Sequence, residues 1–410
     1  MLNCMDIGVK NSQRIIMLFS KRILKLSESP TLQLNNKING LLQKGEDVIN
    51  LTVGEPDYVE PIESSYSAIK AICDHFTHYT NSSGIISLRE SICAKLLKEN
   101  NLAYTPDQIV VSAGGKQALF NAFFVLLNGG EEVLIPTPAW PTYKQQVLLC
   151  GGTPVLIPLD ESSEFKLTKE TLKAFITPRS KILVLNSPSN PTGATYSEEE
   201  LDDLVSIVEE NGLYVISDEI YERLVYSGTY SSPVGINDYM KKHSVLVNGF
   251  SKAFGMTGWR IGYTAAPLDI SIKIAAFQSQ TTASISSISQ VAAKYAINNF
   301  DKEHLIELKE KRNYLIHQLA DTPLKIDVEP GGAFYLFPRV DSVLGNSIYG
   351  ESIDSVEALC ASLLEREHVA ITPGSFFDAP NNVRISYAKS MQEICDAAQR
   401  IKKYFKEGMK

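Results

Sequence analysis

The sequence lacks the residue patterns that mark metal sites, redox sites and disulfide frameworks. Its six cysteines are scattered over 410 residues without a C-x-x-C pair, and its six histidines form no H-x-x-x-H pattern. Zinc sites and catalytic dithiols depend on such spacings, so we expect neither a bound metal nor a redox pair. Unpaired cysteines are typical of a reducing compartment, which favours a cytoplasmic protein.

Basic residues are in deficit, because 47 Asp and Glu outnumber 39 Lys and Arg and leave a net charge of −8. Surfaces that bind nucleic acid normally carry a basic excess, so we expect no nucleic-acid partner. No apolar run reaches the roughly 20 residues that a membrane-spanning helix needs, so we expect no membrane association. Residues 1–26 mix basic and apolar types without the cleavage site of a secretory signal. We interpret them as an extension or amphipathic arm, while a transit peptide and a start at Met17 remain open.

From about Gln108 onward, the sequence contains strand and helix patterns in alternation. Strands are expected over 108–115, 131–136, 153–159, 181–188, 213–219 and 244–251. Helices are expected over 116–128, 140–150, 168–176 and 197–211, the last with Ser197 as N-cap and Glu200 completing a capping box. Alternation of this kind predicts a mostly parallel sheet covered by helices.

The sequence changes character at about Asn299. A long charged helix is expected over 302–320, a second helix over 355–367 and a strand over 383–388, before a last helix. This mixture predicts a smaller α+β unit, and 410 residues are too many for one simple core. We therefore divide the chain into an N-terminal extension and arm that packs with the small domain (1–60), a large domain (61–298) and a C-terminal small domain (299–410).

Polar residues collect where the expected strands end, which is the edge at which open α/β sheets bind ligands. Taken singly, each of these residues is explained by a tight turn, a helix cap or a solvated surface charge. Together they offer a carboxylate, a lysine and a glycine-rich anion cradle, which are the groups that pyridoxal phosphate needs. The residues at these ends are Gly114 and Gly115, Asn190, Asp218 and Tyr221, and Ser251 and Lys252.

Four motifs stand in order along the chain, and together they are far more specific than any one of them. They are SPSNPTG at 187–193, SDEIYERLVY at 217–226, SKAFGMTGWRIGY at 251–263 and VRISYA at 383–388. With these motifs the chain, from about Phe19 to its last helix, resembles the class I pyridoxal-phosphate-dependent aminotransferases of fold type I. The resemblance is closest to the bacterial aspartate aminotransferase branch.

The resemblance implies an α/β protein with the type I fold of pyridoxal-phosphate transferases. In that fold a large cofactor-binding domain carries a mostly parallel seven-stranded sheet between helices, and a smaller α+β domain follows. By the same resemblance, Lys252 bonds covalently to the cofactor and later moves the substrate proton, and Asp218 pairs with the ring nitrogen. Asn190 and Tyr221 would bind the 3′ oxygen of the ring, and Trp140 would stack on its face. Lys252, Asp218 and Tyr221 are the implied catalytic residues.

The resemblance also assigns the phosphate and substrate contacts. The implied phosphate ligands are Gly114, Gly115, Lys116, Ser251 and Arg260. The implied substrate-binding residues are Gly54, Lys116, Trp140, Asn190, Phe334 and Arg384. Among them, Arg384 would bind the α-carboxylate bidentately and Lys116 would pair with the distal carboxylate of aspartate or glutamate. Tyr79 would reach the phosphate of the neighbouring subunit, which implies a homodimer with shared active sites.

These assignments predict an aminotransferase whose substrates are amino acids and 2-oxo acids. It would pass the amino group of aspartate to 2-oxoglutarate through pyridoxamine phosphate in a ping-pong cycle. An aromatic, alanine or broad-range aminotransferase, or a C–S lyase on the same fold, remains the alternative. Relatives that accept prephenate carry a lysine where this chain has Ser27, which argues against prephenate unless Lys25 takes that place.

Overall fold

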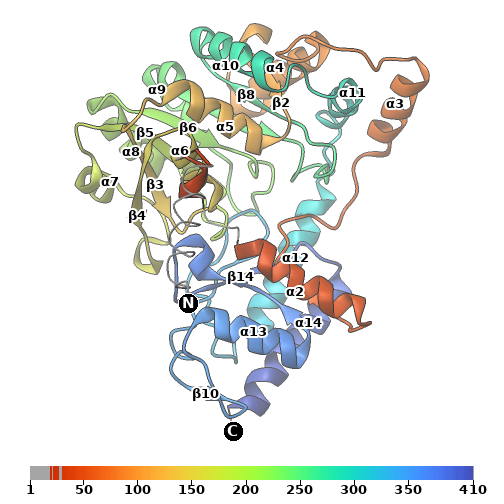
Figure 1. The fold of residues 1–410 in the computed structure, drawn as a ribbon, viewed down its shortest axis with the longest axis vertical. Helices are drawn as coiled ribbons and strands as arrows, with labels where there is room; N and C mark the ends of the chain where they lie inside the picture. The colour runs from red at the N-terminus through yellow and green to blue at the C-terminus, as the bar shows by residue number, and fades with distance from the viewer. Residues whose placement is uncertain (1–18, 21, 27–29, 410) are drawn as a thin grey trace, which may run out of the picture.

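A computed structural model describes residues 19–20, 22–26 and 30–409 of the chain, with side chains described from residue 34 within the first long helix. The expected extension over 1–17 and Ser27 lie outside these residues. Two units are stacked along the long axis of the molecule (Figure 1). We call them the sheet unit, built around one large sheet, and the C-terminal unit, built around the last third of the chain.

Seven strands form the large sheet in the order β2-β8-β7-β6-β5-β3-β4. Their bounds are β2 Ile109–Ser112, β3 Glu132–Thr137, β4 Thr153–Pro158, β5 Ser180–Asn186, β6 Tyr214–Asp218, β7 Ser244–Gly249 and β8 Gly262–Ala265. All neighbours pair in parallel except β8, which runs antiparallel to both β2 and β7. The mostly parallel seven-stranded sheet implied by the sequence is thereby confirmed.

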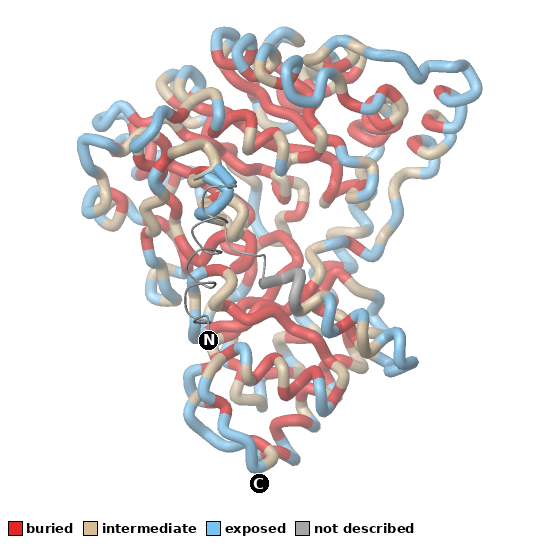
Figure 2. Tube along the Cα trace, in the orientation of Figure 1, coloured by how far each residue is buried: buried red, intermediate tan, exposed pale blue. Residues whose placement is uncertain are grey.

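Helices cover both faces of this sheet, so most residues of its inner strands β5, β6 and β7 are buried (Figure 2). On one face Phe123 and Val147 pack against Ile216 and Val247. On the other face the strands pack against Leu204 and its helix neighbours. The helices of this unit are α3 Ile62–Cys73, α4 Ile86–Asn100, α5 Gly115–Leu126, α6 Thr142–Leu149, α7 Lys169–Phe175, α8 Glu198–Glu210, α9 Asp238–His243, α10 Leu268–Thr281 and α11 Ser287–Ala296.

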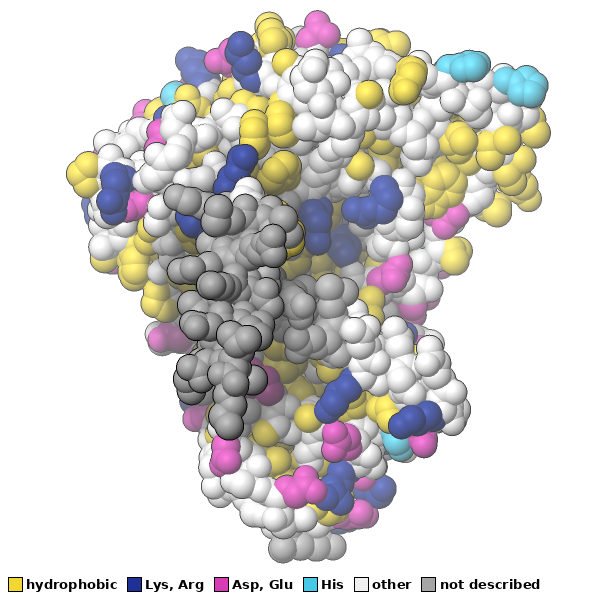
Figure 3. Space-filling view, viewed as in Figure 1, with side chains coloured by type: hydrophobic (Ala, Val, Ile, Leu, Met, Phe, Trp, Pro, Cys, Tyr) yellow, Lys and Arg dark blue, Asp and Glu magenta, His cyan; other side chains and the backbone are white. Residues whose placement is uncertain are grey.

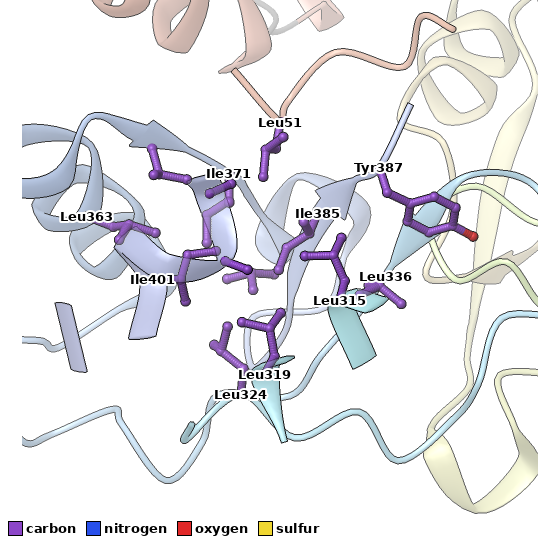
Figure 4. Packing of buried hydrophobic residues seen from close by; sticks show 14 of the residues in the cluster. Leu51, Leu315, Leu319, Leu324, Leu336, Leu363, Ile371, Ile385, Tyr387 and Ile401 are labelled. Atoms are coloured by element: carbon purple, nitrogen blue, oxygen red, sulfur yellow. The ribbon is translucent and has the colours of Figure 1, made fainter. Parts of the chain in front are cut away.

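The C-terminal unit has a core of its own, in which Leu315 and Leu319 pack against Ile371, Ile385 and Ile401 (Figure 4). Its helices are α2 Pro30–Gln43, α12 Glu303–Leu319, α13 Val356–Glu367 and α14 Met391–Gly408. Its strands are β1 Ile49–Asn50, β9 Tyr335–Leu336, β10 Ser347–Ile348, β11 Glu351–Ser352, β12 Val369–Ala370, β13 Thr372–Pro373 and β14 Val383–Ser386. Because β1 pairs in parallel with β12, residues from the start of the chain complete this unit. The exact domain boundaries stay a prediction.

Local sequence signals account for most of these elements. The capping box at the start of α8 is present, with the Ser197 side chain accepting from the Glu200 backbone and the Glu200 side chain accepting in return. The strand pattern did not reveal β8, which has only four residues and directly follows a glycine-rich stretch. In the described part of the chain, no helix combines the length and apolarity needed to cross a bilayer.

Candidate active site

A cavity of about 500 Å³ opens between the two units, at the edge where the parallel strands end. Lys and Arg side chains gather in this hollow (Figure 3). The sheet unit contributes the ends of β5 and β6, the turn after β7 and the start of α5, and the C-terminal unit contributes residues 52–55 and residues of β9 and β14. The lining brings together these predicted site residues: Gly54, Gly115, Lys116, Trp140, Asn190, Asp218, Tyr221, Ser251, Lys252, Arg260 and Arg384.

Asp218 ends β6 and is 4% exposed. Burial raises the pKa of its carboxyl to about 6, although a hydrogen bond from the Tyr143 hydroxyl, 2.7 Å from Oδ2, lowers it in part. Among the described residues, Asp218 makes no ion pair within 4 Å. A buried carboxylate without a close cation suits a ligand that brings its own positive charge.

Tyr143 is a contact that the sequence did not indicate. It lies in the first turn of α6, three residues after Trp140, and the two rings meet edge to face at 5.5 Å. A tyrosine at such a position of a helix is usually part of the hydrophobic core, so the sequence did not indicate that the hydroxyl of Tyr143 bonds to Asp218.

Lys252 lies in the turn that follows β7, and its Nζ donates a hydrogen bond to the carbonyl of Gly54. Its ammonium group lies 5.9 Å from the ring of Tyr221. Burial, and then the positive charge of Arg384, lower the pKa of Lys252 to about 8. A lysine with this pKa offers a neutral amine near physiological pH, as nucleophiles and proton carriers require.

The start of α5 forms an anion cradle. Gly114 caps the helix at φ +83°, and a Cβ there would lie 2.6 Å from Nη2 of Arg260. A Cβ at Gly262 on β8 would lie 2.6 Å from the backbone nitrogen of Gly115, so only glycine permits this approach. Backbone N–H groups at a helix start, Ser251 and a guanidinium together suit a phosphate group.

Arg384 extends from β14 and is 6% exposed. Its Nη1 donates to Oδ1 of Asn190 at 2.9 Å, and its Nη2 donates to the carbonyl of Thr52 at 2.6 Å. The rings of Tyr335 and Phe377 lie 4.6 and 4.7 Å from the guanidinium carbon. Its Nε is buried without a hydrogen-bond partner among the described residues, so the fork retains donor capacity for a carboxylate.

Lys116 follows Gly115 and extends toward Trp140, with Nζ 5.0 Å from the centre of the indole ring. Burial, and then the charge of Arg260, lower the pKa of Lys116. No carboxylate pairs with this lysine in the described part of the chain. The cavity therefore contains a free cation besides Arg384, and two such cations suit a substrate with two carboxylates.

Three predicted residues are absent from the lining. Gly114 adjoins it as the N-cap of α5, directly before Gly115, and the other two are Phe334 and Tyr79. We expected Phe334 in the lining, but the next residue, Tyr335, is there in its place. Both side chains are buried, and the centre of the Phe334 ring lies 6.0 Å from Nζ of Lys252. Tyr335 bonds to Tyr221 through their hydroxyls, 2.8 Å apart. Tyr79 is 90% exposed and outside the lining, so within one subunit it takes no part in the cavity.

The donor set fits the cofactor that the sequence predicts. The cradle at the start of α5 matches a phosphate, Asp218 matches a protonated ring nitrogen, and Lys252 matches an aldehyde. Trp140 and Ile220 in the lining provide apolar surface for a flat ring. In the described part of the chain, no group of three or more His, Cys, Asp or Glu is arranged to hold a metal ion.

Comparison with known proteins agrees with this chemistry. The family model for aminotransferase class I and II matches residues 46–401. A probable aspartate/prephenate aminotransferase of Aquifex aeolicus is 41% identical over 394 residues, which cover 95% of this chain and 98% of that protein. The aspartate aminotransferase of Geobacillus stearothermophilus is 41% identical over 392 residues, which cover 95% of this chain and 99% of that protein. The crystal structure of the Rhizobium meliloti aspartate aminotransferase superposes with a TM-score of 0.91, at 39% identity, over 95% of this chain and 99% of that one.

Proposed function

The chain belongs to the class I and II aminotransferases, and from this premise we propose that it transfers the amino group of aspartate to 2-oxoglutarate. The observation that carries the proposal is the pair of cations, Arg384 and Lys116, in one cavity with Lys252 and Asp218. Among the residues that the structure describes, nothing accepts a hydrogen bond from Nε of Arg384 and no carboxylate pairs with Lys116. Aspartate and glutamate each bring two carboxylates, so they satisfy both cations.

The proposed cofactor is pyridoxal 5′-phosphate, which when bound supplies an electron sink for the charge that develops at the substrate Cα. Gly115 and the following backbone N–H groups, Ser251 and Arg260 would hold its phosphate. Asp218 would pair with the protonated ring nitrogen, and the hydrogen bond from the Tyr143 hydroxyl keeps this carboxylate oriented. These contacts keep the cofactor in place when Lys252 is free.

Lys252 then serves as the base that moves a proton at the substrate Cα. Its depressed pKa, about 8, makes the neutral form available, and the Gly54 carbonyl fixes the direction of Nζ. Arg384 orients the α-carboxylate so that the Cα–H bond points toward this amine. Trp140, Tyr335 and Phe377 line the cavity and would limit the access of water to the Cα that loses its proton.

We further propose that the protein acts as a homodimer with shared active sites. Apolar side chains gather on the outer face of α3 (Figure 3), where Tyr66, Ile69 and Ile72 are each more than half exposed. An exposed apolar face of this kind marks an interface. Tyr79 follows it at 90% exposure, as a residue that enters the neighbouring subunit's cavity would be.

The proposed location is the cytoplasm. The cysteines at positions 73, 93, 150, 360 and 395 are all free thiols. Free thiols throughout a chain are typical of a reducing compartment.

A substrate panel tests the proposed reaction, with 2-oxoglutarate as acceptor and aspartate, phenylalanine and alanine as donors. Aspartate should give the highest kcat/KM. Lys116→Ser should lower kcat/KM for aspartate by about tenfold and leave phenylalanine unchanged, because only aspartate has a distal carboxylate. Lys144→Ser is the matched control, since Lys144 pairs with Asp378 outside the cavity. Equal losses for both donors would remove Lys116 from substrate selection.

An aromatic aminotransferase is the second candidate, because Trp140, Tyr335 and Phe377 line the same cavity. A higher kcat/KM for phenylalanine than for aspartate would favour it. Loss of the amino acid without any acceptor would indicate a C–S lyase.

A further inference from the structure

Residues 54–58 contact both the side-chain nitrogen and the backbone carbonyl of Lys252. The Gly54 carbonyl accepts from Nζ of Lys252, as described above. Four residues later, the Tyr58 hydroxyl donates to the backbone carbonyl of Lys252 at 2.6 Å. The same short piece of chain therefore holds both the side-chain nitrogen and the backbone of the lysine.

The Lys252 carbonyl depends on this hydroxyl. Within its own turn it accepts only a long contact from the Gly255 nitrogen, at 3.4 Å. Gly255 has φ +63°, and a Cβ there would lie 2.4 Å from the Tyr58 carbonyl oxygen, so the two chain segments are in direct contact. Burial, and then the negative charge of Asp57, raise the pKa of Tyr58, which keeps its hydroxyl protonated as a donor.

Tyr58 is itself fixed by α12 in the C-terminal unit. Its ring stacks on His304, with centroids 3.9 Å apart and planes 7° from parallel. The neighbouring Asp57 pairs with Lys311 at 2.9 Å, and the Lys311 side chain is only 7% exposed. Leu308 and Leu315 of the same helix belong to the core of the C-terminal unit. Tyr58 thus connects that core to the turn that carries Lys252.

We propose that Tyr58 is a positioning residue for Lys252, and that its stack on His304 makes α12 the support of that position. The hydroxyl holds the turn after β7 in the conformation that directs Nζ into the cavity. Groups that support a reacting residue in this way set its geometry to within a fraction of an ångström. The expected effect on kcat rests on the proposed role of Lys252, whereas the expected effect on hydrogen exchange does not.

Tyr58→Phe tests the proposal, because it removes one hydroxyl and keeps the ring. Hydrogen–deuterium exchange on the cofactor-loaded protein should speed up about tenfold at the backbone N–H groups of residues 250–256 and stay unchanged in the central strands. The kcat for aspartate should fall about tenfold while KM changes less than about twofold, since substrate binding is left intact.

Tyr239→Phe is a matched control. Tyr239 also stacks on a histidine, His243, with centroids 3.9 Å apart and planes 11° from parallel. Its hydroxyl also donates to a backbone carbonyl, that of Leu213, at 3.1 Å, and it lies outside the cavity lining. This variant should change neither the exchange of residues 250–256 nor kcat.

The support by α12 is tested at His304. His304→Phe should keep the stack and the wild-type exchange rate, whereas His304→Ala should speed exchange in residues 250–256 as Tyr58→Phe does. Unchanged exchange in Tyr58→Phe would overturn the proposal, and so would faster exchange with unchanged kcat. The exchange measurement needs no substrate, so it remains decisive if the amino donor proves not to be aspartate.

Discussion

At the scale of single residues, burial controls the chemistry of Lys252 and Asp218. It lowers the pKa of the lysine to about 8 and raises that of the carboxyl to about 6. Each shift disfavours the charged form, so each group gains from a ligand that reacts with the amine or neutralises the carboxylate. The two residues therefore fit the proposed cofactor together.

Attachment of pyridoxal phosphate to the cofactor-free protein should accelerate with pH, with a midpoint at about 8, because only the neutral amine reacts. The free energy of unfolding should fall as pH falls from about 10.5 to about 8 and then level off, since over that range the unfolded chain binds the proton that folded Lys252 does not. Arg384→Gln should move the midpoint upward by removing one cause of the shift. Absorbance after rapid mixing measures the rate, and a midpoint at the ordinary value of 10.5 would contradict this.

Arg384→Lys should raise KM for every amino acid, because a single ammonium cannot replace a bidentate fork held by Asn190 and the Thr52 carbonyl. The expected loss is about 2–5 kcal/mol, or roughly 30-fold or more. Steady-state kinetics with aspartate and alanine measure it. If KM stays unchanged for both, the α-carboxylate binds elsewhere.

Sequence reasoning found residues whose type and position at a strand end are informative, such as Asp218 and Lys252. It missed Tyr143 and Tyr58, because their hydroxyls act on partners that are 75 and 194 residues away in the chain. Phe334 was expected in the lining where the structure has Tyr335, because the sequence does not indicate which of two adjacent aromatic side chains faces the cavity.

At the scale of elements, the close backbone approach between β8 and the start of α5 builds the proposed phosphate cradle. Periodicity and capping signals predicted these elements well, as the confirmed capping box of α8 illustrates. The antiparallel β8 was not expected, because four residues after a glycine-rich stretch carry too little pattern. Its pairing with β2 depends on contacts across more than 140 positions of the chain, which local patterns do not encode.

Gly262→Ala tests the cradle, because its Cβ would lie 2.6 Å from the Gly115 nitrogen. We expect a loss of about 1–3 kcal/mol in the free energy of unfolding and weaker binding of pyridoxal phosphate. Denaturant unfolding and cofactor titration measure the two effects. Gly258→Ala is the control, since nothing lies within 4 Å of the Cβ that it adds. Wild-type cofactor affinity in Gly262→Ala would show that the phosphate binds elsewhere.

At the scale of the whole molecule, the exposed face of α3 predicts a dimer. Ile69→Asp should dissociate it, because a charge within an apolar interface is costly. Analytical ultracentrifugation should show a monomer for this variant, and activity should fall with it if Tyr79 completes the neighbouring cavity. Ile306→Asp is the control, because Ile306 is 60% exposed on α12, away from α3. A monomeric and fully active wild-type protein would refute shared sites.

The central claim is that Lys252 bonds covalently to pyridoxal phosphate. Borohydride reduction of the cofactor-loaded protein, followed by peptide mass spectrometry, tests it most directly. We predict one modified peptide, carrying the cofactor on Lys252, and no modification in Lys252→Ala. A cofactor adduct on another lysine, or an adduct that persists in Lys252→Ala, would contradict the account.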